Sequence, residues 1–294
     1  MGAEPNSHLD ADLRGLDALD TPLVDAAGRA QRLWSAVWPK LLAVAIVLAG
    51  WQAVVWSGWR PYVIKPPATV ISELGSIMTT ARFYEAVSIT MQRAALGFLL
   101  ATVVGSAIGM AVSQSELLRR AIGSIITGLQ SMPSIAWFPF AIMMFGLTET
   151  AILSVIVLGA APAIANGLIS GVDHIPPILL RVGKVLGARG VAAWRHVVLP
   201  AALPAFVSGL KQGWAFAWRS LMAGELLVMI ASRPSIGVRL HTAREQADAS
   251  GLMAMMIVVL LIGILVDSLV FGSAERRIRR NRGLLGGGAK AAIR

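Results

Sequence analysis

The sequence contains no cysteine and little charge. Without cysteine, the 294-residue chain has no disulfide framework, thiolate nucleophile or cysteine metal site. Its four histidines, His8, His174, His196 and His241, are scattered and lack the spacing of metal ligands. Charged residues make up 14% of the chain, whereas about a quarter is usual for a water-soluble protein. The missing polar surface indicates that lipid surrounds most of the folded chain.

The chain also lacks the short motifs that mark ATP-binding and hydrolytic proteins. It has no Gly-x-x-x-x-Gly-Lys-Ser/Thr phosphate-binding loop, and the glycine-rich stretch at 286–290 has a different spacing. Neither Gly-x-Ser-x-Gly nor His-Glu-x-x-His occurs, and the four histidines fall outside the apolar segments. We therefore predict that the chain is not an enzyme and holds no metal or cofactor itself.

What the sequence does have is hydrophobic length. Hydrophobic residues make up 56% of the chain, and the mean hydropathy is +0.69. A helix needs about 20 mostly apolar residues to cross a bilayer. The sequence therefore predicts an all-α, polytopic membrane protein with six transmembrane helices. We place them at about 40–56, 88–113, 121–145, 151–170, 203–230 and 252–272.

The third of these segments is interrupted by polar residues and prolines. Gln130, Ser131 and Pro133 follow one another closely, and Pro139 comes six residues after Pro133. Proline removes a helix N–H, and a membrane tolerates this only where protein or a water-filled cavity satisfies the freed carbonyls. We expect a helix that is broken near a cavity.

Basic residues set the predicted orientation. Six spans place both termini on one side, and with the termini in the cytoplasm 17 of the 26 Lys and Arg lie inside. Positive residues stay on the cytoplasmic side, so we predict a multi-pass protein of the bacterial plasma membrane with cytoplasmic termini. They flank the apolar segments rather than mixing with aromatics on a soluble domain, which argues against nucleic acid. The predicted parts are a polar tail (1–33), a six-helix domain (34–275) and a basic tail (276–294).

The second span carries a stripe of small residues. Gly97, Ala101, Gly105 and Gly109 are four apart, so they lie along one face of the helix. Small residues let another helix approach closely within a membrane. The neighbour is either another subunit or another helix of this chain, and we favour packing within the chain.

The segment 171–200, between the fourth and fifth spans, is predicted to carry the function. Pro176 and Pro177 open a short helix from Ile178 to Leu186, which Gly187 ends. Its leucines and valines alternate with basic residues. Such a cytoplasmic helix suits docking into a groove on a soluble partner, although basic amphipathic helices also lie on acidic lipid.

The spacing within this segment resembles the EAA signature of bacterial binding-protein-dependent ABC permeases. That signature reads Glu-Ala-Ala, three residues, Gly, nine residues, Ile, one residue, Leu-Pro. Arg181, Val182 and Gly183 stand at its first three positions, with Arg181 replacing the acidic residue. Val197 stands at the Ile position. The resemblance implies that the ATPase-coupling residues are Leu180, Arg181, Val182, Gly183, Lys184, Val185, Leu186, Gly187, Ala188, Leu199 and Pro200.

Further similarities to the sulfonate, taurine and nitrate permeases of this family extend from about residue 34 to residue 280. They are closest to the aliphatic-sulfonate permeases and include Pro66-Pro67, Arg93 with Gly97-Phe98, Met132-Pro133 and Phe145-Gly146. The resemblance implies a type I ABC importer permease (MetI-like) fold and a homodimer with a second copy of this chain. It also implies a cytoplasmic ABC ATPase dimer, which binds ATP and Mg, and an extracytoplasmic solute-binding protein. The implied substrate is an aliphatic sulfonate or a taurine-like anion, with nitrate or another small solute as the alternative.

The fifth span holds candidate residues for the translocation path. Trp214, Trp218, Met222 and Glu225 recur on one helical face, with Arg219 on its flank. Charges inside a membrane often mark a pathway, and a guanidinium matches the oxygens of a sulfonate. The alternative is that the charged side chains at the ends of the span extend toward the headgroups. Ser131 and Pro133 complete the candidate path because they lie at the expected helix break.

Two other classes of membrane protein compete with this interpretation. A secondary transporter would favour internal repeats and paired intramembrane charges, and we find no convincing repeat. A membrane-embedded enzyme would need a nucleophile and base, or metal ligands, at membrane depth. Neither class explains the helix predicted in the long cytoplasmic segment.

Overall fold

The computed structural model describes residues 29–230 and 232–281, and every regular element within them is helical. These residues belong to two compact units, which divide between Pro61 and Tyr62. The first unit contains α2 (Arg29–Trp56). Its apolar part, Val37–Trp56, is long enough to span a membrane, and none of its residues is fully buried among the described residues. The length and apolar character of this helix suit a membrane-spanning segment.

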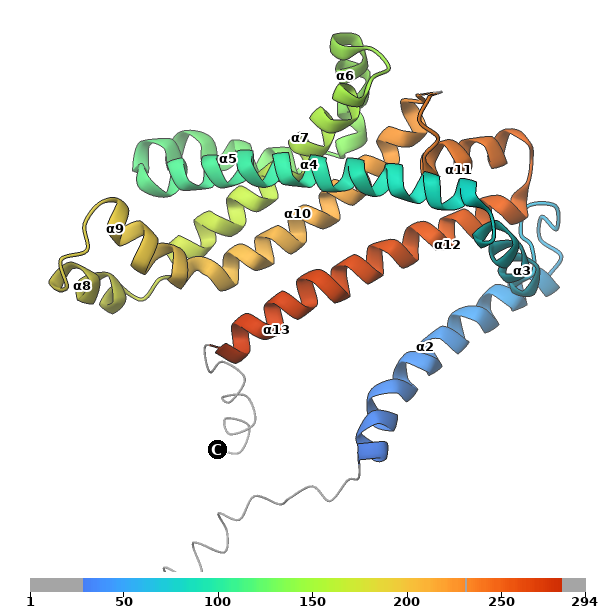
Figure 1. Cartoon of the computed structure of the whole chain (residues 1–294), viewed down its shortest axis with the longest axis horizontal. Helices are drawn as coiled ribbons and strands as arrows, with labels where there is room; N and C mark the ends of the chain where they lie inside the picture. The colour runs from blue at the N-terminus through green and yellow to red at the C-terminus, as the bar shows by residue number, and fades with distance from the viewer. Residues whose placement is uncertain (1–28, 231, 282–294) are drawn as a thin grey trace, which may run out of the picture. The chain divides into compact units, whose positions relative to one another are not determined.

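Three long helices form the core of the second unit. They are α4 (Ala81–Gln114), α7 (Glu149–Asp173) and α10 (Leu199–Leu227), and α7 packs against both of the others (Figure 1). A Cβ added at Gly105 would lie 2.6 Å from the carbonyl oxygen of Ala161, so α4 and α7 approach at backbone distance. The small-residue stripe of α4 is thus filled by α7 of the same chain, as we favoured.

The third span is broken, as its prolines predict. α5 (Glu116–Ser131) is followed by the 3-10 turn η1 (Ser134–Trp137) and α6 (Phe138–Phe145), with a bend of 101° at the break. Gln130 Nε2 donates to the carbonyl oxygen of Pro162 in α7, at 3.3 Å. Among the described residues, five helices are long and apolar enough to cross a membrane, and this bent pair is the sixth candidate. The expected all-α architecture is confirmed, with six spans when the bent pair counts as one.

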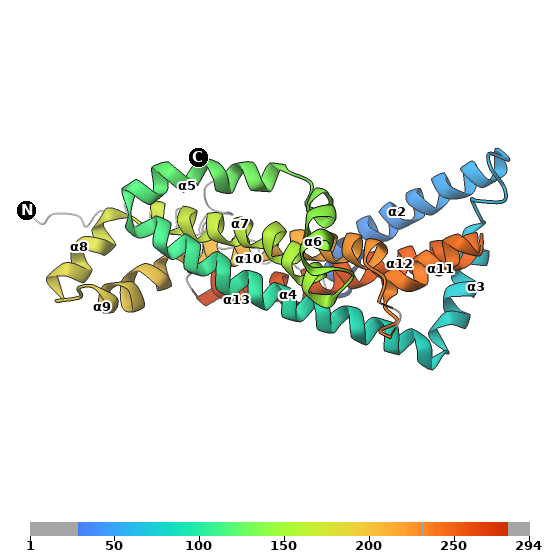
Figure 2. The ribbon, with the colours of Figure 1, turned by 90° about the horizontal axis from the view of Figure 1, so that it is seen from above.

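The remaining helices of the second unit lie before and after this core. α3 (Pro67–Met78) packs on α12 (Ala249–Val266), which continues through the π turn η3 (Asp267–Phe271) into α13 (Gly272–Asn281). The last helical run therefore extends beyond the predicted 252–272. α11 (Ile236–Glu245) was not predicted, because its polar sequence has no apolar stripe. It lies beside α12 in both views (Figures 1 and 2).

Three short elements connect α7 to α10. α8 (Pro177–Val185) is followed by α9 (Val191–Ala193) and the π turn η2 (Trp194–Val198), which leads directly into α10. Pro200 cannot donate a backbone hydrogen bond at the start of α10, and π turns are common where a helix loses its regular pairing. The helix expected at Ile178–Leu186 is thus present with a shift of one residue.

Candidate coupling loop, translocation groove and ion cluster

The C-terminus of α8 has the hydrogen bonds of a Schellman motif. Ala188 N donates to Gly183 O at 2.9 Å, and Gly187 N donates to Lys184 O at 3.1 Å. Gly187 has a φ of +82°, in the left-handed region that glycine adopts without steric cost. Gly187, the glycine of the EAA-like spacing, therefore has a local structural role. It ends α8 and turns the chain toward α9.

Gly183 sets the distance between α8 and η2. It is buried, and a Cβ at this position would lie 2.8 Å from Val197 Cγ2. Beside this contact is a hollow of about 450 Å³ between α8 and the α9–η2 segment. Its lining includes four predicted coupling residues. These are Leu180, Gly183, Lys184 and Ala188. The spacing between Gly183 and Val197 in sequence thus corresponds to a direct packing contact.

The outer face of α8 is apolar, basic and uncovered. Val185 and Leu186 are 87% and 80% exposed, far more than a helix packed within its own fold would allow. Arg181 and Lys184 are also exposed on this helix. This face combines apolar side chains that favour burial with two positive charges that favour an acidic neighbour.

The base of the coupling loop is attached to the core at two points. Ile175, Val198 and Ala202 form a small buried cluster that joins the loop to α10. Arg119 Nη1 lies 2.6 Å from Asp173 Oδ1, which joins the start of α5 to the end of α7. A force applied to α8 therefore reaches the long helices through packed contacts.

A groove of about 680 Å³ lies between α10 and α12. On the α10 side, Trp214 and Trp218 are stacked with their ring centroids 6.0 Å apart. Most of the remaining lining is aliphatic. The α12 side is formed by Met256, Val259, Leu260, Gly263 and Ile264. Asp267 and Ser268 lie at one end of the lining, so the groove is a mostly apolar slot with an aromatic wall and one carboxylate.

Arg219 is exposed at this groove. Its Nε donates to Ala215 O at 3.0 Å, and its guanidinium carbon lies 4.8 Å from the ring centroid of Phe216. About two helical turns nearer the start of α10, Lys211 forms an ion pair with Asp267 at 3.2 Å. Arg219 thus borders the groove and has no carboxylate partner within the described residues.

The structure separates the candidate path residues into two groups. Four of them line the groove together. The other three lie elsewhere: Glu225 is fully buried in an ion cluster, while Ser131 and Pro133 are exposed at the break between α5 and η1. Ser131 Oγ donates to Gly128 O at 2.7 Å, within its own helix. The groove group is Trp214, Trp218, Arg219 and Met222.

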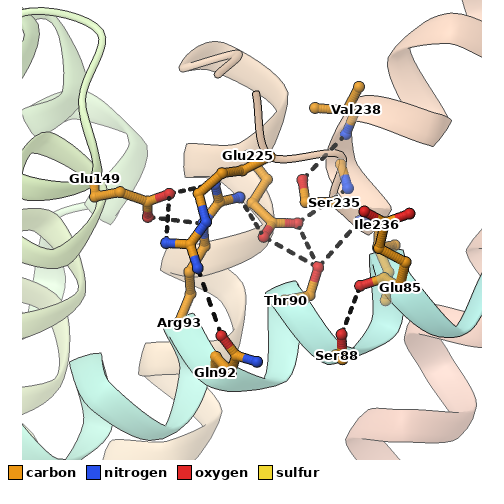
Figure 3. Close-up of polar contacts among 12 residues, drawn as sticks. Glu85, Ser88, Thr90, Gln92, Arg93, Glu149, Glu225, Ser235, Ile236 and Val238 are labelled. Atoms are coloured by element: carbon orange, nitrogen blue, oxygen red, sulfur yellow. Dashed lines mark hydrogen bonds and ion pairs between the residues drawn. The ribbon is translucent and has the colours of Figure 1, made fainter. Parts of the chain in front are cut away.

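Arg93 is the centre of that ion cluster (Figure 3). Its Nη1 lies 2.9 Å from Glu225 Oε1, and its Nε and Nη2 bind both carboxylate oxygens of Glu149 at 2.8 and 2.6 Å. Arg233 adds a second cation, 3.4 Å from Glu149. The side chain of Arg93 is 4% exposed and that of Glu225 is 0% exposed. One arginine thus joins α4, α7 and α10 with a planar, multidentate pairing.

The same cluster holds the N-terminus of α11. Backbone N–H groups of the first turn of a helix have no partner within the helix. Here Ile236 N donates to Thr90 Oγ1, Gly237 N to Glu225 Oε2 and Val238 N to Ser235 Oγ (Figure 3). The negative charge of Glu225 also suits the positive end of the helix dipole. The buried carboxylate of Glu225 thus binds the first turn of α11.

This cluster was not predicted from the sequence as a unit. Arg93 stood out only among the family similarities, Glu225 was predicted to lie on the path, and Glu149 did not stand out. The available signal was the presence of opposite charges in different spans, since charges within a membrane usually pair. Choosing the partners required the three-dimensional arrangement of the helices.

The chain was compared with known proteins. Residues 97–280 match the family described as the binding-protein-dependent transport system inner membrane component. The chain is 28% identical over 235 residues to the putative aliphatic sulfonates transport permease SsuC of Bacillus subtilis (79% of this chain, 84% of the relative). It is 27% identical over 223 residues to the taurine transport system permease TauC of Escherichia coli (74% and 80%). Identity reaches 30% over 191 residues to the nitrate import permease NrtB of Leptolyngbya laminosa (65% and 67%).

Solved structures of importers share the fold at lower identity. The inward-facing MetNI methionine ABC transporter matches with a TM-score of 0.57 and 19% identity, over 67% of this chain and 96% of that chain. A bacterial ABC transporter that imports the acidic polysaccharide alginate matches with a TM-score of 0.57 and 15% identity, over 84% and 99%. The resemblance to the sulfonate, taurine and nitrate permeases is thereby confirmed. The chain belongs to the binding-protein-dependent transport system inner membrane component family, and it is a permease subunit of an ABC importer.

Proposed function

We propose that this permease moves a small oxyanion, an aliphatic sulfonate or a taurine-like anion, into the cytoplasm by alternating access. The observation that carries the proposal is that the single helix α10 connects the coupling loop, the groove and the ion cluster. From Leu199 at the coupling loop to Glu225 at the ion cluster, this helix is about 40 Å long at 1.5 Å per residue. The groove with Arg219 lies between the two ends. A movement at the base of α10 is therefore transmitted along one helix.

The coupling loop is proposed to dock on a cytoplasmic ATPase dimer, which binds ATP and Mg. The proposed coupling residues extend from Leu180 to Ala188 and include Leu199 and Pro200. The exposed apolar face of α8 favours insertion into a groove of the partner. Because Arg181 stands where the family signature has an acidic residue, we expect that groove to be acidic. ATP binding drives the switch only if the ATPase dimer binds the two permease states differently.

The groove is proposed to line the translocation path. The Arg219 guanidinium presents forked donors that match the oxygens of a sulfonate, and its Nε alone is used by a protein acceptor. Trp214, Trp218 and Met222 supply an apolar wall suited to an aliphatic carbon chain. The carboxylate in the lining, Asp267, is paired with Lys211. The combination of Arg219 with an apolar wall therefore supports an organic anion over a purely polar solute. The relative NrtB makes nitrate the second candidate.

The proposed assembly is a homodimer with both termini in the cytoplasm and an extracytoplasmic solute-binding protein on the other side. The excess of Lys and Arg in segments on the proposed cytoplasmic side supports this orientation. The apolar length of α2 supports its burial in lipid or against a second copy. Ser131 and Pro133 remain candidates for the path within this dimer, where a second copy adds lining that one chain does not contain.

Uptake of a labelled aliphatic sulfonate tests the proposal. Cells that lack this gene are compared with and without the restored chain, with labelled nitrate in a parallel arm. We expect uptake of the sulfonate that requires both the chain and ATP. Uptake of nitrate alone would transfer the assignment to nitrate. If neither anion required the chain while the ATPase still co-purified, the oxyanion assignment would fail and the permease class would stand.

Arg219→Gln tests the role of the groove. Removing the guanidinium is expected to lower sulfonate uptake about tenfold, which corresponds to about 1.4 kcal/mol of lost binding. The matched control is Arg120→Gln, which removes an exposed arginine that pairs with Glu116 far from the groove. Unchanged uptake in Arg219→Gln at equal membrane levels would exclude Arg219 from the path.

A further inference from the structure

The last span continues without a break into a basic helix. α12, η3 and α13 form one helical run from Ala249 to Asn281. Arg276, Arg277 and Arg280 follow its apolar part within a few residues, and all three are exposed. The helix therefore brings a group of arginines to the end of a membrane span at a fixed depth.

The arginines lie on the exposed side of α13, and the guanidinium of Arg276 lies back along the helix beside Gly272. Ile278 and Glu275 of α13 line a small hollow together with Pro204 and Val207 of α10. At 100° per residue, Arg276 and Arg280 lie on the side of the helix opposite to Glu275 and Ile278. One face of α13 thus packs on α10, and the other presents positive charge outward.

The depth of these arginines matches the headgroup layer. The apolar sequence of α12 starts at Leu252, four residues after its N-cap Asp248. About 30 Å of hydrocarbon corresponds to about 20 helical residues, which places the opposite edge near residue 272. Arg276 then lies about 6 Å beyond this edge, and a headgroup layer is about 5–8 Å thick on each side. The guanidinium groups are therefore within reach of lipid phosphates.

These arginines have no anionic partner in the described part of the chain. By contrast, Lys211 and Arg119 each form an ion pair with an aspartate. Arg276, Arg277 and Arg280 pair with no carboxylate among residues 29–230 and 232–281. Their charge is therefore available to a ligand from outside the chain.

We propose that the basic face of α13 (Arg276, Arg277 and Arg280) binds the headgroups of anionic phospholipids. Guanidinium forks pair with phosphate oxygens in two hydrogen bonds, and clusters of basic residues directly after a span attract anionic lipid. A lipid partner fits better than the ATPase, because this face is purely basic and lies at headgroup depth, whereas α8 combines charge with an exposed apolar surface. Bound lipid holds α13 at the membrane surface and so steadies α12 beside the groove.

The number of lipids retained by the purified permease–ATPase complex tests this inference. The complex is incubated with dioleoylphosphatidylglycerol or dioleoylphosphatidylcholine, and bound lipid is counted by native mass spectrometry at low and high salt. We expect severalfold preference for the anionic lipid, and loss of that preference at about 0.5 M salt, because screening shortens the reach of surface charges to a few ångströms.

Matched variants identify the responsible surface. Arg276→Gln/Arg280→Gln is expected to lose most of the preference for phosphatidylglycerol, while Arg276→Lys/Arg280→Lys retains part of it because the charge remains. Arg82→Gln/Arg244→Gln removes the same charge from exposed positions on α4 and α11 and is expected to retain the preference. Thermal unfolding of each variant distinguishes a local loss of lipid from a folding defect.

Two results would overturn the inference. One is equal retention of phosphatidylglycerol by the wild type and the Arg276→Gln/Arg280→Gln variant. The other is loss of the ATPase from this variant with unchanged lipid retention, which would make α13 a protein-docking surface instead.

Discussion

At the scale of single residues, buried charge is the feature that shapes this permease most. Glu225 has no solvent exposure and is stabilised by Arg93, by the hydroxyl of Thr90 and by the backbone N–H of Gly237. A Cβ on Gly237 would clash with the Glu225 side chain, so only glycine permits this approach. Each residue of the cluster thus depends on the presence of its neighbours.

Removing Arg93 alone is predicted to be more harmful than removing the charge pair. In Arg93→Met, Glu225 keeps no cation, whereas Glu149 still has Arg233 at 3.4 Å. Breaking one partner of a buried pair costs about 3–5 kcal/mol, and removing both charges costs much less. Thermal unfolding in detergent should therefore show partial recovery in Arg93→Met/Glu225→Gln. A double variant that is no more stable than Arg93→Met would contradict this account of the cluster.

Arg239 is a half-buried cation that, unlike Arg93, has no carboxylate partner among the described residues. Its Nη1 is the buried side-chain atom without a hydrogen-bond partner within the described residues. Burial and the nearby charge of Arg82 both lower the pKa of Arg239, which means that its charged form is disfavoured there. Arg239→Met keeps the apolar stem and removes the unpaired charge, so we expect an equal or higher unfolding temperature. The control is Arg244→Met, since Arg244 is exposed and paired with Glu245. A clear loss of stability in Arg239→Met but not in Arg244→Met would contradict this prediction, because it would show that the Arg239 guanidinium makes a stabilising hydrogen bond or ion pair.

At the scale of elements, the short helix α8 depends on how it ends. Its last turn is closed by the Schellman hydrogen bonds around Gly187, and its packing distance from η2 is set by Gly183. The exposed face of α8 is then held in one orientation relative to α10. The coupling proposal therefore depends on backbone geometry as well as on the identity of the exposed side chains.

Gly187→Val is predicted to uncouple ATP hydrolysis from uptake. A β-branched residue at a φ of +82° is strained, at a cost of about 1–3 kcal/mol, so the end of α8 should unwind. ATPase activity and uptake are measured together in proteoliposomes, and we expect uptake per ATP to fall while membrane insertion is normal. Gly187→Asn is the matched control, because asparagine tolerates the left-handed region. Coupled uptake at the wild-type ratio in Gly187→Val would refute a coupling role for this helix end.

At the scale of the whole molecule, the absence of cysteine permits a direct test of the proposed orientation. Val185→Cys places a thiol on α8, and Gln246→Cys places one just after α11; both positions are exposed. With an impermeant maleimide, Gln246→Cys should be labelled in right-side-out vesicles and Val185→Cys in inverted vesicles. The cysteine-free wild type controls for background labelling. The opposite pattern would place the termini outside the cytoplasm.

The sequence by itself determined the class of this protein and much of its layout. Apolar length predicted six spans, because a bilayer requires a minimum helix length whatever the packing. Prolines predicted the break at Pro133, and Pro176, Pro177 and Gly187 predicted the short helix α8. These features depend on local backbone chemistry, which neighbouring residues in sequence are sufficient to specify.

Only the tertiary structure decided which residues meet. Glu225 shares its helical face with the groove tryptophans in sequence, yet it is drawn into the cluster of Arg93 and Glu149 from two other helices. α11 lacks an apolar stripe, and side chains of α4 and α10 supply the anchor for its first turn. A charge inside a membrane must find a partner, but the choice of partner depends on helix packing, which brings together residues more than 100 positions apart in sequence.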